Sequence, residues 1–117
     1  MRQPSLLQSF RHAWEGVRTT FLQERNFRLH VAAAVGVILV GSVVGLTRME
    51  WLAIGGTIAL MFVSELFNTS LEKICDAVTL EKHPYIKLAK DAAAGACLVM
   101  ACFCLLVGGV IFLPKFL

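Results

Sequence analysis

Charged residues are scarce in this 117-residue chain, and its longest apolar stretches lack them almost entirely. Asp, Glu, Lys and Arg make up 16% of the residues, whereas hydrophobic residues make up 57%. Residues 92–113 carry no charge, and residues 29–46 carry only the ionisable His30, at their start. A soluble domain of this length could not bury so much apolar surface, so the composition indicates a membrane protein instead.

Several motifs that would indicate other classes of protein are also missing. The first 18 residues, MRQPSLLQSFRHAWEGVR, lack the apolar core of a secretory signal peptide, so we expect the first hydrophobic segment to stay in the membrane. The four cysteines show neither zinc-finger spacing nor a C-x-x-C motif, and we interpret them as small apolar residues. The chain also lacks G-x-x-x-x-G-K-[ST] and G-x-G-x-x-G, so a nucleotide would have to bind on helices.

The apolar segments predict an all-α integral membrane protein, a single domain over residues 1–117 with three transmembrane helices at about 29–46, 51–74 and 92–113. The middle segment has only 13 apolar residues, Trp51 to Val63, which are too few to cross a bilayer. This helix must therefore take Glu65 and Asn68 to membrane depth. We expect a tight hairpin at 47–50 and a polar loop at 76–91, in which Pro84 interrupts helical structure.

An amphipathic surface helix is predicted at about 5–25, because apolar residues recur there at spacings of three and four. The basic residues set the orientation. Nine of them lie in the N-terminal arm and the second connection, against Arg48 and Lys115 on the other side. The positive-inside rule therefore predicts a cytoplasmic N-terminus and a C-terminus outside the cell.

Four polar residues recur at intervals of three or four along the middle helix, forming one stripe: Glu65, Asn68, Glu72 and Asp76. A charge at membrane depth costs at least ~2.5 kcal/mol, so the protein must compensate the charges of the stripe or use them in its function. An ion pair between spans is one explanation, but no Lys or Arg lies inside any apolar segment. We therefore interpret the stripe as functional and expect its acids to lack partners in the chain.

Acidic groups near the end of a membrane helix favour a hard cation. Mg²⁺ commonly takes one or two carboxylates and completes its shell with water and substrate phosphates. Glu24 should lie at the same depth as Glu72, and Lys90 and Asp91 return to that depth before the third span. Carboxylates for a metal together with a Lys for phosphate predict a nucleotide site.

Three blocks of the sequence resemble a known family. SELFNTSLEKICD, ERNFRLHVAAA and KLAKDAAAGA are similar, in order and spacing, to blocks of the prokaryotic diacylglycerol kinase family. ERNF followed by His30, AKDAAAGA and the closing IFLPK look most like its undecaprenol kinase branch. The resemblance covers about residues 10–115.

The resemblance implies a homotrimer in a bacterial cell membrane, with active sites shared between subunits and no nucleic-acid partner. Glu65 matches the catalytic base, and Glu24 and Glu72 match the carboxylates that hold Mg²⁺ with ATP. The remaining positions of the polar and nucleotide site would be His12, Asn68, Asp76, Glu81, Lys82, His83, Lys90 and Asp91. Ser5 and Gln8 depart from the diacylglycerol kinase branch, which carries basic residues there.

The expected function is therefore an ATP- and Mg²⁺-dependent kinase that phosphorylates undecaprenol, with diacylglycerol as the alternative membrane lipid alcohol. A small proton- or ion-conducting oligomer is a more distant alternative, and a non-catalytic membrane scaffold would leave the cost of the stripe unexplained. We expect Val35, Leu39, Met61 and Phe62 to line an apolar groove for the lipid. Gly41 and Gly45, four residues apart, predict close approach between helices.

Overall fold

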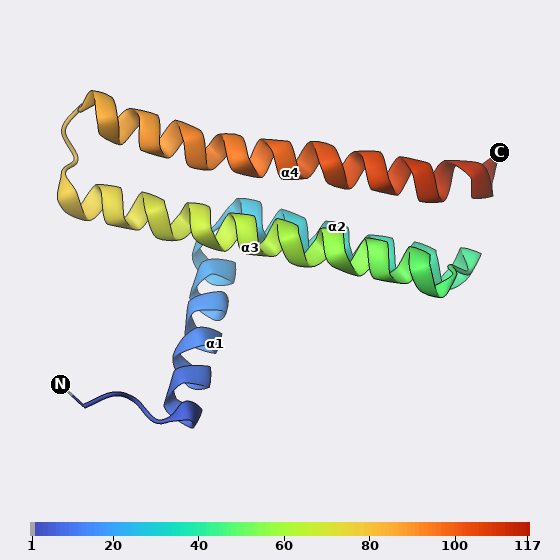
Figure 1. Ribbon diagram of the computed structural model, residues 1–117, viewed down its shortest axis with the longest axis horizontal. Helices are drawn as coiled ribbons and strands as arrows, with labels where there is room; N and C mark the ends of the chain where they lie inside the picture. The colour runs from blue at the N-terminus through green and yellow to red at the C-terminus, as the bar shows by residue number, and fades with distance from the viewer. Residues whose placement is uncertain (1) are drawn as a thin grey trace.

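The computed structural model describes residues 2–117, which form four helices and no strand in that range (Figure 1). They are α1 (Leu6–Gln23), α2 (Arg25–Val44), α3 (Arg48–Val78) and α4 (Pro84–Phe116). Three of them, α2, α3 and α4, are long and apolar enough to cross a membrane. The prediction of an all-helical chain with three helices long and apolar enough to span a membrane is therefore confirmed. The polar stripe lies on a single uninterrupted helix, α3.

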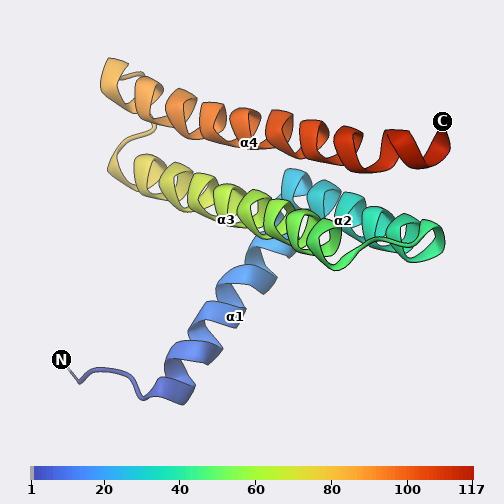
Figure 2. The same cartoon turned by 45° about the vertical axis from the view of Figure 1, so that its right-hand side comes forward.

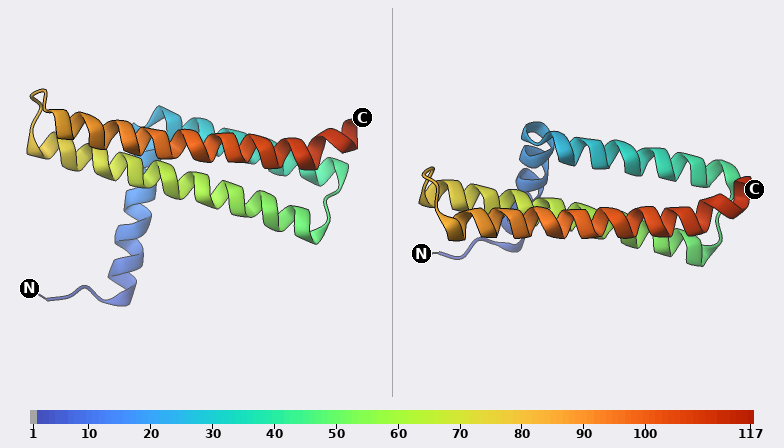
Figure 3. Two further views of the ribbon diagram at one scale, coloured as in Figure 1. Left: turned by 45° about the horizontal axis from the view of Figure 1, so that its top comes forward. Right: turned by 90° about the horizontal axis from the view of Figure 1, so that it is seen from above.

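The helix α3 is the centre of the arrangement, because it packs against each of the other three. α4 runs beside it along its length, and α2 packs on α3 rather than on α4 (Figure 3). α1 projects transversely from the three long helices (Figures 1 and 2). The ends of α3 and α4 that are joined by the 79–83 connection extend beyond the junction of α1 and α2 (Figure 1).

Side chains cap the N-terminal ends of α1 and α3. Ser5 and Gln8 form a capping box at α1: the Ser5 hydroxyl accepts from the Gln8 N–H at 3.2 Å, and the Gln8 side chain accepts from the Ser5 N–H at 2.9 Å. Thr47 and Glu50 form the same motif at α3. The tight hairpin expected at 47–50 lies instead at residues 45–47, because this capping box satisfies the free N–H groups and lets the helix begin at Arg48.

The second connection is also shorter than expected. Residues 76–78 complete α3 and residues 84–91 form the first turns of α4, so only residues 79–83 lie outside the helices. Pro84 does not interrupt a helix but occupies its first turn, after His83 as the N-cap. At that position a missing N–H costs nothing, and the fixed φ of proline suits a helix.

The two glycines near the end of α2 have different roles. A Cβ on Gly41 would lie 2.8 Å from Leu46 Cδ1 and 2.9 Å from Trp51 Cη2, so this glycine permits close packing of the 45–47 turn and the start of α3. Gly45 is the C-cap of α2 and has φ of 79°, a conformation that side chains disfavour. The close approach of α2 to the start of α3 therefore depends on Gly41, and the conformation of the 45–47 turn depends on Gly45.

Candidate active site

Glu65 is the most deeply enclosed acid of the stripe, with 6% of its surface exposed. It comes from the middle of α3 and faces α2, where His30 Nε2 lies 3.2 Å from Glu65 Oε1. The expectation that the stripe acids lack partners is therefore wrong for Glu65. Histidine provides the partner, and a search of the spans for Lys or Arg alone does not detect it.

Asn68 lies one turn further along α3. Its Oδ1 atom is buried and has no hydrogen-bond partner within residues 2–117. A buried amide oxygen without a donor is costly unless a bound group or a neighbouring molecule satisfies it. The position of this oxygen in the acidic stripe makes it a candidate contact for a ligand.

Glu24 joins α1 to α2, as C-cap of the first and N-cap of the second. Its carboxylate lies 3.9 Å from the Nζ atom of Lys73, the neighbour of Glu72 along α3. The fold therefore brings Glu24 to the same level of α3 as Glu72, although they are 48 positions apart in the sequence. Both side chains are only partly buried, so a ligand can reach them.

No three His, Cys, Asp or Glu side chains within residues 2–117 gather into a metal site. Two carboxylates and an unsatisfied amide oxygen, however, fit Mg²⁺, which usually binds few protein ligands and keeps water or phosphate in its shell. The donors available from Glu24, Glu72 and Asn68 are all oxygens, as this ion prefers.

The last acid of the stripe is also paired. Lys90 of α4 donates to Asp76 of α3 at 2.6 Å, so the prediction of an unpartnered acid is wrong here too. One turn of α4 holds a second pair, Lys87 with Asp91 at 2.6 Å. The Lys87–Asp91 pair is largely exposed and the Lys90–Asp76 pair is partly exposed, which keeps their net stabilising effect small and leaves the two lysines free to exchange their partners for a phosphate.

Four of the expected nucleotide residues stand apart from this cluster. His12 lies on α1, exposed, 3.8 Å from Glu15 on the same helix. Glu81, Lys82 and His83 form part of the exposed 79–83 connection, where His83 Nδ1 accepts from the Tyr85 N–H at 3.2 Å. The single chain thus brings together Glu24, the stripe and Lys90, but not His12.

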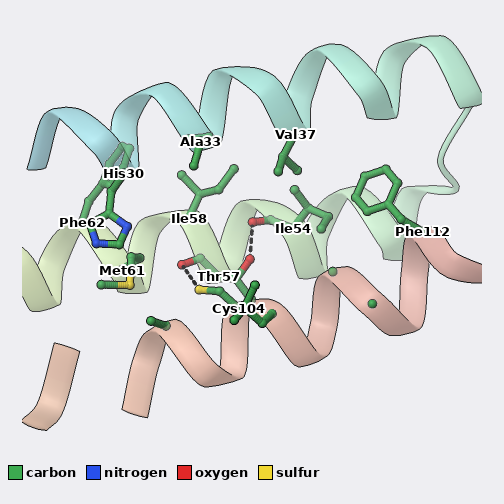
Figure 4. Close-up of a pocket in the computed structure, with 15 residues that line it drawn as sticks. His30, Ala33, Val37, Ile54, Thr57, Ile58, Met61, Phe62, Cys104 and Phe112 are labelled. Atoms are coloured by element: carbon green, nitrogen blue, oxygen red, sulfur yellow. Dashed lines mark hydrogen bonds between the residues drawn. The ribbon is translucent and has the colours of Figure 1, made fainter. Parts of the chain in front are cut away.

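An apolar cavity of about 430 Å³ opens between α2 and α4, with α3 as its floor (Figure 4). His30 lies at one end, next to Met61 and Phe62, and Phe112 lies at the other (Figure 4). The walls include Ala33 and Val37 of α2, and Gly108 and Phe112 of α4. The cavity is therefore apolar along its length, with an imidazole at the end nearest Glu65.

The few other polar groups of this cavity are already engaged. The Thr57 hydroxyl donates to the Ile54 carbonyl at 2.8 Å, and the Cys104 thiol lies 3.6 Å from the Thr57 carbonyl (Figure 4). Of the expected groove residues, Met61 and Phe62 line the cavity. Val35 and Leu39 do not: they point outward and are 52% and 62% exposed, because α2 turns its other face to α3.

Two features of the site do not follow from the sequence. The first is the contact of His30 with Glu65, for which the position of His30 at the start of the first apolar segment is the available signal. The second is which residues line the apolar groove: the sequence predicts Val35 and Leu39 and omits the wall formed by α4, because the rotation of each helix about its axis has no signal in an apolar span.

The fold and the site define a class: a helical membrane protein whose acidic site lies at one end of its longest spans, next to an apolar cavity. Comparison with known proteins narrows this class. Residues 11–112 match the family model described as prokaryotic diacylglycerol kinase. The chain belongs to this family, and it is accordingly a lipid kinase and a multi-pass membrane protein.

Individual relatives agree with the family match. The chain is 47% identical over 107 residues to an undecaprenol kinase of Bacillus subtilis, a match that covers 92% of this chain and 87% of that protein. It is 42% identical over 115 residues to a diacylglycerol kinase of Synechocystis, covering 97% of this chain and 66% of that protein. A diacylglycerol kinase of Helicobacter pylori is 31% identical over 112 residues, with 96% and 88% covered.

Proposed function

We propose that this protein phosphorylates undecaprenol with ATP and Mg²⁺ at the cytoplasmic face of a bacterial membrane. The observation that carries the proposal is the buried Glu65, which is linked through His30 to the end of an apolar cavity. A lipid lying in that cavity would bring a terminal hydroxyl toward the carboxylate without leaving the bilayer. The similarity to the Bacillus subtilis undecaprenol kinase supports the choice of lipid.

In the proposed reaction, Glu65 is the catalytic base. The lipid hydroxyl loses its proton to the Glu65 carboxylate, its oxygen forms a bond to the terminal phosphorus of ATP, and the bond from that phosphorus to the ADP oxygen breaks. Mg²⁺ held by Glu24 and Glu72 would offset the negative charge of the phosphates. The Oδ1 atom of Asn68 has no hydrogen-bond partner among residues 2–117. The bound metal-nucleotide, or a water molecule that it carries, would provide that partner.

The remaining nucleotide contacts would come from two subunits of a homotrimer. Lys90 could contact the phosphates from the same chain, while Asp76, its partner in the stripe, and Asp91 would reach them only through a cation. The other expected contacts, Glu81, Lys82, His83 and His12, lie apart from the cluster. His12 lies on α1, which projects away from α3 and α4 (Figure 2), so it would contact the site of a neighbouring chain rather than its own.

The transverse direction of α1 also supports its role as a surface helix. If α2, α3 and α4 cross the bilayer, a helix perpendicular to them lies parallel to the membrane plane. Its exposed apolar side chains, which include Leu7, Phe10 and Trp14, would then rest in the interface. The excess of basic residues on this side favours a cytoplasmic N-terminus and a C-terminus outside.

The cavity favours a polyprenyl chain over diacylglycerol. A polyprenol is a methyl-branched hydrocarbon with one hydroxyl, whereas diacylglycerol has ester carbonyls that benefit from nearby donors. The Thr57 hydroxyl and the Cys104 thiol are already directed at backbone carbonyls, and the rest of the wall is apolar apart from His30. Undecaprenol would thus leave no polar group of its own unsatisfied in the cavity.

A competition assay tests this proposal. Purified protein in mixed micelles receives ATP, Mg²⁺ and both lipids at equal mole fraction, and each phosphorylated product is quantified. We expect a higher specificity constant for undecaprenol. Preference for diacylglycerol would overturn the choice of lipid and leave the kinase assignment standing, whereas no product from either lipid would overturn the proposed reaction.

The same phosphorylation assay tests whether Glu65 is the catalytic base. Glu65→Gln should keep Mg²⁺-ATP binding but slow phosphoryl transfer by roughly 10²- to 10⁴-fold, because only the proton acceptor is lost. Glu50→Gln is the matched control: it lies on the same helix, also removes a carboxylate from an interhelical pair, and keeps a capping-box side chain at α3. Near-normal turnover by Glu65→Gln at saturating lipid would exclude Glu65 as the base.

A further inference from the structure

His30 is an ionisable residue that the proposed reaction does not yet use. It comes from the first turns of α2, and its Nε2 atom lies 3.2 Å from Glu65 Oε1. Its side chain is 29% exposed, whereas that of Glu65 is 8% exposed. The imidazole therefore lies between the enclosed carboxylate and more open space.

The more open side of His30 is the apolar cavity. His30 lines that cavity together with Met61 and Phe62, whereas Glu65 itself does not line it (Figure 4). A lipid hydroxyl that arrives through the cavity would thus meet the imidazole beside the carboxylate. An imidazole can present an N–H to a carboxylate with one nitrogen and keep the other nitrogen for a second partner.

The Glu65 carboxylate has few other means of being held. Met61 and Phe62, one turn away on α3, are apolar, and the nearby Cys97 thiol of α4 is a weak donor that is also directed at the Ser64 carbonyl, at 3.5 Å. A base must hold its oxygen within about 3 Å of the proton that it takes, and a small misplacement reduces the rate strongly. His30 Nε2, at 3.2 Å from Glu65 Oε1, lies close to that distance and belongs to a stronger donor than a thiol.

We propose that His30 is a positioning residue of the phosphoryl-transfer site, which holds the Glu65 carboxylate through Nε2 and directs the lipid hydroxyl from the cavity toward it. This inference rests on the proposed function and adds a residue to it. His30 takes no part in the bonds that form and break. It acts through Glu65, so its removal should lower kcat for the lipid while the KM for ATP stays the same.

The test compares three substitutions. Gln can place an amide N–H near the position of Nε2, Asn places one near Nδ1, and Leu has similar bulk without a polar atom. We expect His30→Leu to lower kcat by roughly tenfold to a hundredfold. His30→Gln should recover several-fold over both His30→Leu and His30→Asn, because the contact to Glu65 uses Nε2.

A double substitution shows whether His30 acts through Glu65. His30→Leu combined with Glu65→Gln should be no slower than Glu65→Gln alone, because the positioned group is already gone. Lys115→Leu is the control: Lys115 contacts Glu50 at 3.2 Å between α4 and α3, with 25% of its side chain exposed, far from Glu65 along α3. It should keep kcat near that of the unmodified protein.

The outcomes separate the two proposals. Three results would overturn the role of His30 and leave the proposed function standing. They are an unchanged kcat in His30→Leu, recovery by Asn rather than Gln, and fully additive losses in the double variant. An unmodified protein that phosphorylates neither lipid overturns the proposed function. If His30→Leu does not fold, which circular dichroism in detergent detects, the comparison of Gln with Asn decides the matter.

Discussion

At the scale of residues, the acids of the stripe differ in their surroundings and therefore in what they can do. Glu65 is enclosed and contacts an imidazole, whereas Asp76 is about half exposed and paired with Lys90. Glu24 and Glu72 lie between these extremes, and the Glu24 carboxylate lies 3.9 Å from the end of the long Lys73 side chain. The partly exposed pair is the suitable one for a metal that arrives with its nucleotide, and the enclosed acid is suitable for a proton from a lipid.

We predict that Glu24 and Glu72 act together through one metal-nucleotide complex. Glu24→Gln and Glu72→Gln should each weaken Mg²⁺-ATP binding, and the double variant should lose less than the sum of the two changes in binding free energy, because either change already breaks the site. Nucleotide binding measured by calorimetry in detergent, across a Mg²⁺ titration, checks this. Losses that simply add would show that the two carboxylates bind independently.

At the scale of elements, α3 is a membrane helix that extends into a polar region without a break. Thr47 and Glu50 start it, no Gly or Pro interrupts residues 57–78, and it ends at Val78. Its start is held by the 45–47 turn, whose Leu46 packs with Trp51 over Gly41 of α2. The position of α2 against α3, and with it the contact of His30 with Glu65, therefore depends in part on a glycine at the opposite end of the bundle.

We predict that Gly41→Ala lowers the thermal-unfolding midpoint in detergent, at a cost of about 1 kcal/mol or more, because its Cβ would lie within 3 Å of Leu46 and Trp51. Gly36→Ala is the matched control on the same helix: no atom of the chain outside α2's own backbone lies within 4 Å of its Cβ, so its stability should not fall. Equal midpoints for both variants would contradict the packing role of Gly41.

At the scale of the whole molecule, one chain does not enclose its own site. α2 packs on α3 rather than on α4, which leaves the cavity open between them, and α1 projects away from the bundle (Figures 2 and 3). Asn68 Oδ1 has no partner within residues 2–117. These features suit an oligomer in which a neighbouring chain covers the site.

We predict that subunits with different defects restore activity to each other. His12→Ala chains and Glu65→Gln chains should each have low activity alone, because one lacks a nucleotide contact and the other lacks the base. Co-expression with two affinity tags and purification on both yields mixed oligomers, in which His12 of one chain can serve Glu65 of the next. The activity of these oligomers per site measures the recovery. If the mixed oligomers are no more active than the separate variants, His12 does not serve the Glu65 of a neighbouring chain.

The sequence by itself determined the architecture of this protein, because the relevant signals are local. Long apolar stretches specify spans, and the 3.6-residue period places Glu65, Asn68, Glu72 and Asp76 on one face whatever the helix packs against. The capping boxes at Ser5 and Thr47 are equally local. They correspond to S-x-x-Q and T-x-x-E patterns in the sequence, and the second of these places the start of α3 at Arg48, before the end of the turn expected at 47–50.

Only the tertiary structure decided which of these residues meet. His30 and Glu65 are 35 positions apart, and their contact depends on the rotation of α2 about its axis, which no periodicity within α2 specifies. The same rotation turns Val35 and Leu39 outward and places Ala33 and Val37 in the cavity. In a membrane helix nearly every face is apolar, so the hydrophobic pattern that orients helices in soluble proteins is weak. Close packing at positions such as Gly41 sets the orientation instead.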